Sequence, residues 1–157
     1  MNPRYDPAKL SPLGYKAMLD LEHYLTNCGL EPTLLDLLKL RASQINGCAY
    51  CIDMHSKDLR AIGETEQRLY ALDAWRETPF YSDRERAALA WTEAVTRVAS
   101  NHVPGTIYQE TRSHFSEKEI SDLTLAIAAI NAWNRIAISS RAVPGDYQPP
   151  KPSEAGA

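Results

Sequence analysis

The spacing of apolar residues constrains this sequence most, because they recur every three or four positions through most of the chain. One such helix face carries Leu34, Leu35, Leu38, Ala42 and Ile45. Alternating runs of β-branched and aromatic residues, which are typical of strands, are missing. The sequence therefore predicts an all-α protein.

Helix boundaries are marked by capping residues. The segments 82–85 and 116–119 have the spacing of a capping box, Gly29 and Gly63 stand where helices end, and Pro32 suits a first helical turn. We expect a single helical domain over residues 1–142 with six or seven helices. Their predicted ranges are 15–28, 32–46, 48–62, 65–76, 83–95, 104–114 and 117–140.

The chain changes character after residue 142. Four prolines in the short polar stretch 143–157 predict an extended C-terminal tail with no core of its own. Such a tail either lies against a neighbouring subunit or remains loose.

The net charge and the hydropathy pattern of the chain argue against nucleic-acid and membrane partners. The 157 residues carry a net charge of −3, and the basic residues form no run, so we expect no nucleic-acid partner. Segment 120–138 is apolar, but Asp122, Asn131, Asn134 and Arg135 interrupt it, which predicts a buried helix rather than a membrane span. With no signal peptide visible at the N-terminus, we expect a cytoplasmic protein. The amount of apolar helix surface favours a homo-oligomer, as a dimer, trimer or hexamer.

Residues 46–55 contain the candidate reactive side chains. Cys48, Cys51 and His55 are spaced to lie on one side of a helix, and Gly47 breaks the preceding helix just before Cys48. The free N–H groups of the new helix then favour a thiolate, whose pKa in such positions is commonly about 1 to 5 units below that of free cysteine. His55 can take a proton from Cys51 or stabilise its thiolate. The pattern predicts a dithiol that oxidises through a sulfenic acid to a disulfide.

Three other interpretations are open at this point. The pair can be half of a zinc site, but structural zinc needs four ligands, and Cys28 is the third and last cysteine. A thioredoxin-type site has the same spacing within a βαβ pattern, which this sequence lacks. A buried structural pair is the third interpretation, and the glycine break and the nearby histidine argue against it.

The segment Asp36-Leu37-Leu38-Lys39-Leu40-Arg41-Ala42-Ser43-Gln44-Ile45-Asn46-Gly47-Cys48-Ala49-Tyr50-Cys51-Ile52-Asp53-Met54-His55 resembles the alkyl hydroperoxidase D-like (AhpD-like) branch of the carboxymuconolactone decarboxylase family. The similarity continues through Ser56-Lys57-Asp58 and Gly63-Glu64-Thr65-Glu66 and returns at Ala132-Trp133-Asn134-Arg135. It extends over most of residues 30–147.

The resemblance implies an all-helical fold, symmetric oligomers and reduction of peroxides by the cysteine pair. Cys51 would be oxidised by the peroxide, Cys48 would donate a proton and resolve the sulfenic acid to a disulfide, and His55 would belong to a proton relay with an acid on the preceding helix. Asp36 stands where the family usually has glutamate, and Tyr50 stands where some members have histidine. Carboxymuconolactone decarboxylases proper lack the cysteine pair, so decarboxylation is not expected.

The remaining candidates receive ordinary interpretations. We assign Trp75, Trp91 and Trp133 to the core or an interface, Cys28 to the core, and Arg41 to a surface ion pair. The sequence thus predicts a thiol-dependent peroxidase that uses a hydroperoxide, a thiol or dithiol reductant, no bound cofactor and no metal. The alternatives are a redox-sensing or stress-responsive dithiol protein with little turnover, and a zinc-binding structural module.

Overall fold

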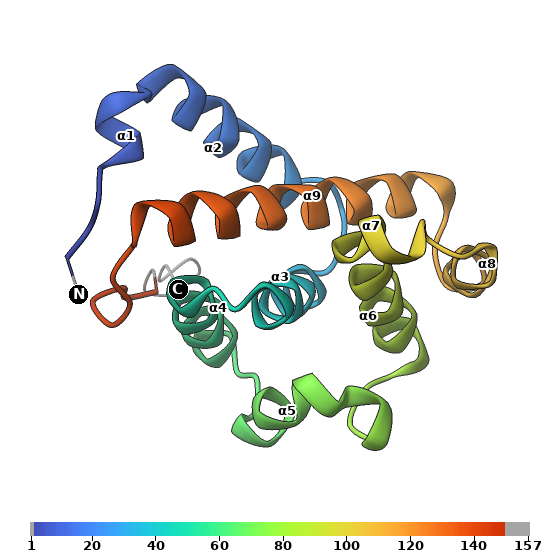
Figure 1. Ribbon diagram of the computed structural model, residues 1–157. Helices are drawn as coiled ribbons and strands as arrows, with labels where there is room; N and C mark the ends of the chain where they lie inside the picture. Colours follow the sequence, from blue (N-terminus) through green and yellow to red (C-terminus); the bar gives the residue numbers. More distant parts are fainter. Residues whose placement is uncertain (1, 150–157) are drawn as a thin grey trace, which may run out of the picture.

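The computed structural model describes residues 2–149, and none of these lies in a strand (Figure 1). The helices are α1 (Pro7–Leu10), α2 (Pro12–Thr26), α3 (Pro32–Asn46), α4 (Ala49–Ala61), α5 (Glu66–Ala71), the 3-10 helix η1 (Leu72–Glu77), α6 (Asp83–Thr96), α7 (Val98–Asn101), α8 (Gly105–Arg112) and α9 (Glu117–Ser140). The prediction of an all-α fold is confirmed.

Both predicted capping boxes are present. The Ser82 hydroxyl accepts a hydrogen bond from the backbone N–H of Glu85, and the Glu85 carboxylate accepts one from the N–H of Ser82. Ser116 and Glu119 make the same reciprocal pair at the start of α9. These bonds satisfy N–H groups that a helix start leaves unpaired, which explains why α6 and α9 begin where the sequence places them.

The helix prediction differs from the structure in the short elements. The expected helix over 65–76 is divided into α5 and η1, with a non-helical backbone at Ala74 (φ −109°, ψ 29°). The single turns α1 and α7 were not predicted, because four residues are too few to show a helical period.

Helix α3 lies at the centre of the fold, where it packs against α4, α6 and α9. In Figure 1, α9 runs across the upper part of the molecule above α3, and α2 lies along it. Leu34, Leu35 and Leu38 of α3 pack with buried residues of α6 and α9. Leu37 and Leu40 belong to a second cluster with α5 and η1. Burial of each leucine contributes about 2 kcal/mol, so α3 is firmly held where it leads into the cysteine segment.

Arg41 corrects one prediction, because it is buried and not part of a surface ion pair. Its Nε donates to the Glu93 carboxylate at 2.9 Å, and its guanidinium also pairs with Asp73. Glu93 accepts a further bond from the indole N–H of Trp75 at 3.0 Å. This network joins α3, η1 and α6, with Arg41 and Glu93 in the interior and Asp73 at the surface. Trp75 and Trp91 are buried as expected, whereas Cys28 is only partly buried.

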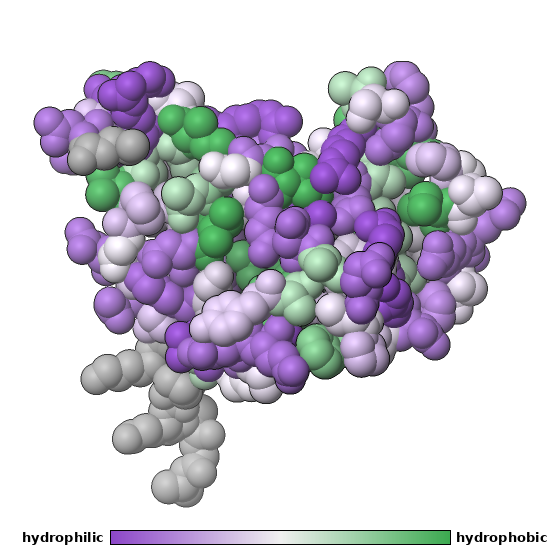
Figure 2. All heavy atoms as spheres, turned by 60° about the horizontal axis from the view of Figure 1, so that its bottom comes forward, coloured by the Kyte–Doolittle hydropathy of each residue, from purple (hydrophilic) through white to green (hydrophobic). Residues whose placement is uncertain are grey.

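The surface is mixed in character. Figure 2 shows one face, on which hydrophilic residues predominate and hydrophobic residues form separate patches. The exposed large apolar residues include Leu10, Leu13 and Leu19 near the N-terminus. Within residues 2–149, no helix has the length and apolar character needed to cross a bilayer. Self-association stays a prediction.

Residues 143–149, here called the C-terminal strap, lie against α4 of the same chain. The Lys57 ammonium donates to the backbone carbonyls of Gly145 at 2.8 Å and Tyr147 at 3.0 Å. The N–H of Gly145 donates to the Asp53 carboxylate at 3.1 Å. This part of the predicted tail is therefore held against α4 of its own chain, and a contact with a neighbouring subunit stays a prediction. Residues 150–157 of that tail lie outside the described residues.

Candidate functional site

A left-handed glycine joins α3 to α4. Gly47 has φ +67° and ψ +33°, a conformation that costs a non-glycine residue about 1 to 2 kcal/mol. The turn is tied to α9 by amides, because the Asn46 side chain donates to Asn134 at 2.8 Å and Asn134 donates to the Ser43 hydroxyl at 3.0 Å. The glycine and the amide network together fix the direction in which α4 starts.

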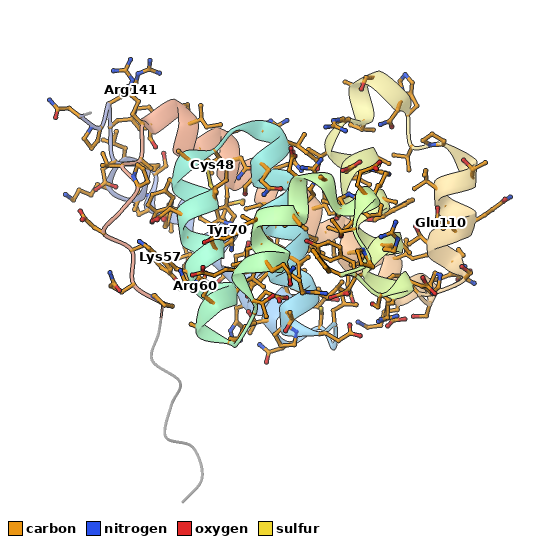
Figure 3. All side chains as sticks on the ribbon, turned by 90° about the horizontal axis from the view of Figure 1, so that it is seen from below. Cys48, Lys57, Arg60, Tyr70, Glu110 and Arg141 are labelled. Atoms are coloured by element: carbon orange, nitrogen blue, oxygen red, sulfur yellow. A yellow bond between two sulfur atoms is a disulfide. The ribbon has the colours of Figure 1, made fainter. Side chains whose placement is uncertain are left out.

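Cys48 is the N-cap residue of α4. Its sulfur accepts a hydrogen bond from the backbone N–H of Cys51 at 3.4 Å, which satisfies one of the unpaired N–H groups of the first turn. Cys48 and Cys51 form a disulfide, with their Cα atoms 5.4 Å apart. Both residues are almost inaccessible, with exposed fractions of 1% and 2%. Figure 3 shows Cys48 at one end of α4 and Lys57 farther along the helix, beside the strap.

His55 lies one turn beyond Cys51 and is 5% exposed. Burial, assisted by the positive charge of Lys39, lowers the pKa of its imidazole to about 3, so the ring is neutral at pH 7. Among the described residues, neither ring nitrogen has a hydrogen-bond partner. Buried polar atoms without partners are rare in proteins, and a catalytic role is one of the explanations for them.

Two carboxyl groups lie near the same nitrogen of His55. Asp36 on α3 and Asp58 on α4 each have an oxygen 3.8 Å from Nδ1. This distance is too long for a hydrogen bond, and the neutral ring makes neither contact an ion pair at pH 7. Burial raises the pKa of Asp36 to about 6. Burial also raises the pKa of Asp58, although a hydrogen bond from Tyr147 and the charge of Lys39 oppose that shift.

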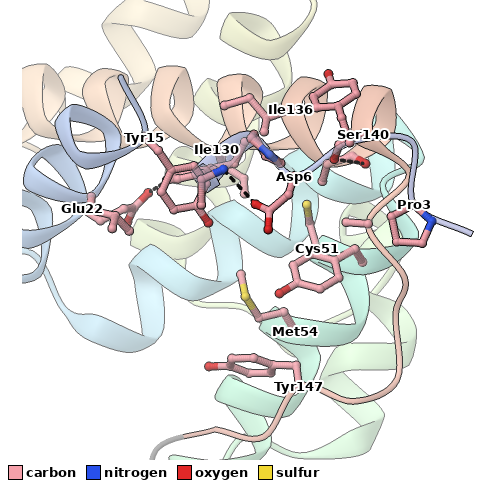
Figure 4. A pocket seen from close by; sticks show the side chains of 18 of the residues that line it. Pro3, Asp6, Tyr15, Glu22, Cys51, Met54, Ile130, Ile136, Ser140 and Tyr147 are labelled. Atoms are coloured by element: carbon pink, nitrogen blue, oxygen red, sulfur yellow. Dashed lines mark hydrogen bonds between the residues drawn. The ribbon is translucent and has the colours of Figure 1, made fainter. Parts of the chain in front are cut away.

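A cavity of about 710 Å³ lies beside Cys51 (Figure 4). Cys51 and His55 line it, whereas Cys48 does not. Most of the wall is apolar or aromatic, and its members include Tyr15, Leu19, Tyr50, Met54, Ile130 and Trp133. The ring centroids of Tyr15 and Trp133 lie 5.1 Å apart in an edge-to-face arrangement. A cavity of this size accommodates an organic molecule, and of the two cysteines it is Cys51 that lines the cavity.

The structure brings together all the residues singled out from the sequence. Cys48, Cys51, His55 and Asp36 are neighbours around the start of α4, and Tyr50 lies in the cavity wall. Trp133, assigned above to the core or an interface, lines the cavity and donates its indole N–H to Glu22 at 3.0 Å.

Sequence reasoning missed two polar side chains of the site. Asp58 was recognised only as part of the family match, although its position three residues after His55 on one helix was a usable signal. Tyr147 stands in the proline-rich tail, where no local pattern indicates a contact with α4. The segment 3–8 also contributes to the cavity wall, and it was not assigned to the site either.

The zinc interpretation depends on a ligand set among the described residues. Between residues 2 and 149, no group of three or more His, Cys, Asp or Glu side chains is arranged to hold a metal ion. The zinc interpretation therefore lacks a ligand set in this part of the chain.

The site and fold define a class of all-helical proteins with a dithiol at a helix start beside a buried histidine. The sequence pattern of the carboxymuconolactone decarboxylase family matches residues 12–94, a segment that includes both cysteines, His55 and both nearby aspartates. The chain belongs to the carboxymuconolactone decarboxylase family. Two of its structural neighbours are described as AhpD or as an AhpD core, which confirms the resemblance inferred from the sequence.

Three relatives place the chain more closely. It is 46% identical to the uncharacterised protein YdfG of Bacillus subtilis, over 88% of this chain and 95% of YdfG. A protein of unknown function from Agrobacterium tumefaciens, suggested to be the antioxidant defence protein AhpD, shares 45% identity with a TM-score of 0.90, over 93% of this chain and 100% of that one. An uncharacterised peroxidase-related protein from Ralstonia eutropha, described as an AhpD core, shares the fold at 22% identity and a TM-score of 0.78, over 88% and 74% of the two chains.

Proposed function

We propose that this protein is a thiol-dependent peroxidase that reduces hydroperoxides through a Cys48–Cys51 dithiol–disulfide cycle. The observation that carries the proposal is the asymmetry of the cysteine pair. Cys51 faces a large, mainly apolar cavity beside a buried histidine, and Cys48 lies behind it within disulfide distance. Membership of a family with AhpD-like, peroxidase-related structures supports the same activity.

The first half of the cycle oxidises Cys51. Its thiolate attacks the terminal oxygen of the hydroperoxide, an S–O bond forms, the O–O bond breaks, and the alkoxide leaves. His55 takes the thiol proton before the attack and returns it to the alkoxide, which leaves as an alcohol. A thiolate next to the ring favours the imidazolium, which offsets the effect of burial on the pKa of His55.

The second half closes the disulfide. The Cys48 thiol attacks the sulfenic sulfur of Cys51, the S–S bond forms, and the hydroxyl group leaves as water with the Cys48 proton. A thiol or dithiol reductant then returns two electrons and two protons to the pair. The chemistry resides in sulfur and needs no bound cofactor.

Stopped-flow oxidation of the fully reduced protein tests the proposal. Hydrogen peroxide and an organic hydroperoxide are each mixed with the protein, and the remaining thiols are counted. We expect two thiols per chain to disappear much faster than those of free cysteine, and Cys51→Ser to abolish the fast reaction. Cys28→Ser is the matched control and keeps it, because Cys28 lies outside the site. Thiols that react no faster than free cysteine would exclude a peroxidase and favour a redox-sensing dithiol protein.

A further inference from the structure

We propose that Asp58, held in place by Tyr147 of the C-terminal strap, is the carboxylate that exchanges the proton of His55 with the cavity. The proposal rests on the proposed function, because it assigns the proton route of that same site. It adds a second acid to the one that the family pattern places on α3, and it gives the strap a part in catalysis.

The two carboxylate oxygens of Asp58 make different contacts. Oδ2 lies 3.8 Å from Nδ1 of His55, and Oδ1 accepts a hydrogen bond from the Tyr147 hydroxyl at 2.6 Å. The first distance needs to shorten by about 1 Å to become a hydrogen bond, a change typical of catalytic groups when substrate binds. Because Tyr147 fixes the carboxylate, Oδ2 stays directed towards the ring.

Access to the cavity distinguishes the two acids. Asp58, His55 and Tyr147 all line the cavity, whereas Asp36 does not. Asp36 lies equally close to Nδ1, but it approaches the ring from α3. A proton that reaches His55 from the cavity, or leaves for it, therefore has a direct path through Asp58. Asp36, which approaches from α3 and does not line the cavity, is suited to orienting the ring.

Tyr147 is a positioning residue, and its place depends on the strap. The backbone bonds from Lys57 to Gly145 and Tyr147, and from Gly145 to Asp53, set the strap along α4. In Figure 4 the Tyr147 ring lies next to Met54 in the cavity wall. The phenol therefore closes part of the cavity and holds Asp58 at the same time.

The charges around Asp58 determine the direction of the expected pH effect. His55 and Tyr147 face it directly, Lys39 on α3 favours its charged form, and Asp36 lies near the same ring nitrogen of His55. The hydrogen bond from Tyr147 is made to the carboxylate and lowers the pKa of Asp58. Removal of the phenolic hydroxyl raises the pKa of Asp58. Its carboxyl group then stays protonated to a higher pH, and over that added pH range it cannot accept a proton from His55.

The test measures the alkylation of Cys51 in the reduced protein by iodoacetamide as a function of pH, with mass spectrometry to locate the label. No peroxide is used, so failure of the peroxidase proposal does not affect this readout. The variants are Asp58→Asn, Asp58→Glu and Tyr147→Phe. Tyr70→Phe is the matched control, because its hydroxyl donates to the carboxylate of Glu66 at 2.9 Å and neither residue lines the cavity.

We expect Asp58→Asn to slow alkylation at neutral pH about tenfold or more and to move the acid limb of the profile, which reports the Cys51 thiolate, to higher pH by about one unit or more, with partial recovery in Asp58→Glu. Tyr147→Phe moves the limb in the same direction by up to about one unit, and Tyr70→Phe leaves it unchanged. Should Asp58→Asn misfold by circular dichroism, the shift in Tyr147→Phe decides the matter. Unchanged profiles in Asp58→Asn and Tyr147→Phe, or a limb moved by Asp36→Asn alone, would overturn the proposal.

Discussion

The side chain of Cys51 lines the cavity, whereas Cys48, its disulfide partner, lies behind it at the N-cap of α4. A molecule in the cavity therefore meets one sulfur first. The order of the two thiols in the proposed cycle follows from this arrangement, and it can be tested by removing each thiol in turn.

We expect Cys48→Ser to trap the cycle at the sulfenic acid, because the resolving thiol is missing. One equivalent of peroxide then produces a product at Cys51 that a dimedone-type reagent labels. Cys51→Ser should give no labelled product at Cys48 on the same timescale. Labelling of Cys48 in that variant at the rate seen for Cys51 would reverse the assigned order.

The turn at Gly47 should be sensitive to a single methyl group. Gly47→Ala meets no atom within 4 Å, so its cost is the left-handed backbone alone. We expect the free energy of unfolding to fall by about 1 to 2 kcal/mol. Gly14→Ala is the matched control, since that site in α2 is equally open and has no positive φ. It should be stabilising by about 0.5 to 1 kcal/mol. Urea unfolding of the oxidised variants measures both changes.

Much of the fold follows from local sequence signals. Pro32, the two capping boxes and the apolar face of α3 predict the long helices, because each signal acts within one or two turns of the chain. The split between α5 and η1 was missed, since it arises at one non-helical residue, Ala74, inside an otherwise helical pattern.

The site was predicted only in part for a related reason. Cys48, Cys51 and His55 are neighbours in sequence, so the spacing rule for helices was enough to group them. Tyr147 reaches Asp58 across 89 residues of the chain, and Trp133 reaches Glu22 across 111. Contacts of this range depend on how α9 and the strap pack, which no local pattern encodes. Arg41 was assigned to the surface, and its burial was missed because its partner Glu93 is likewise distant in sequence.

The aromatic wall of the cavity should select among peroxides. We expect Trp133→Ala to lower kcat/KM for a bulky organic hydroperoxide about tenfold, because the variant loses apolar contact area. The reaction with hydrogen peroxide should change much less, since that molecule is too small to use the wall. Trp91→Phe, in the core and outside the cavity lining, is the control. Equal losses for both substrates would show that Trp133 acts on the protein scaffold and not on substrate binding.

Asp36 should make the folded protein less stable at neutral pH. Burial raises its pKa from 3.8 to about 6 in the folded state. Between these values the folded chain binds more protons than the unfolded chain, so this group's contribution to stability falls as pH rises through that window and is constant above it. The shift corresponds to about 3 kcal/mol at pH 7.

Asp36→Asn keeps the shape of the side chain and removes the charge. We expect it to raise the free energy of unfolding at pH 7 by about 1 to 3 kcal/mol, with the gain shrinking below pH 6 and vanishing near pH 4.

His55 titrates in the opposite sense, because its lowered pKa makes the folded state lose stability as pH falls from 6.5. Comparison of variant with wild type at each pH cancels that background. Urea unfolding of the oxidised proteins at several pH values provides the measurement, and Asp20→Asn, at an exposed ion pair with Lys16, is the control. A gain that does not depend on pH would mean that the charge of Asp36 is not its cause.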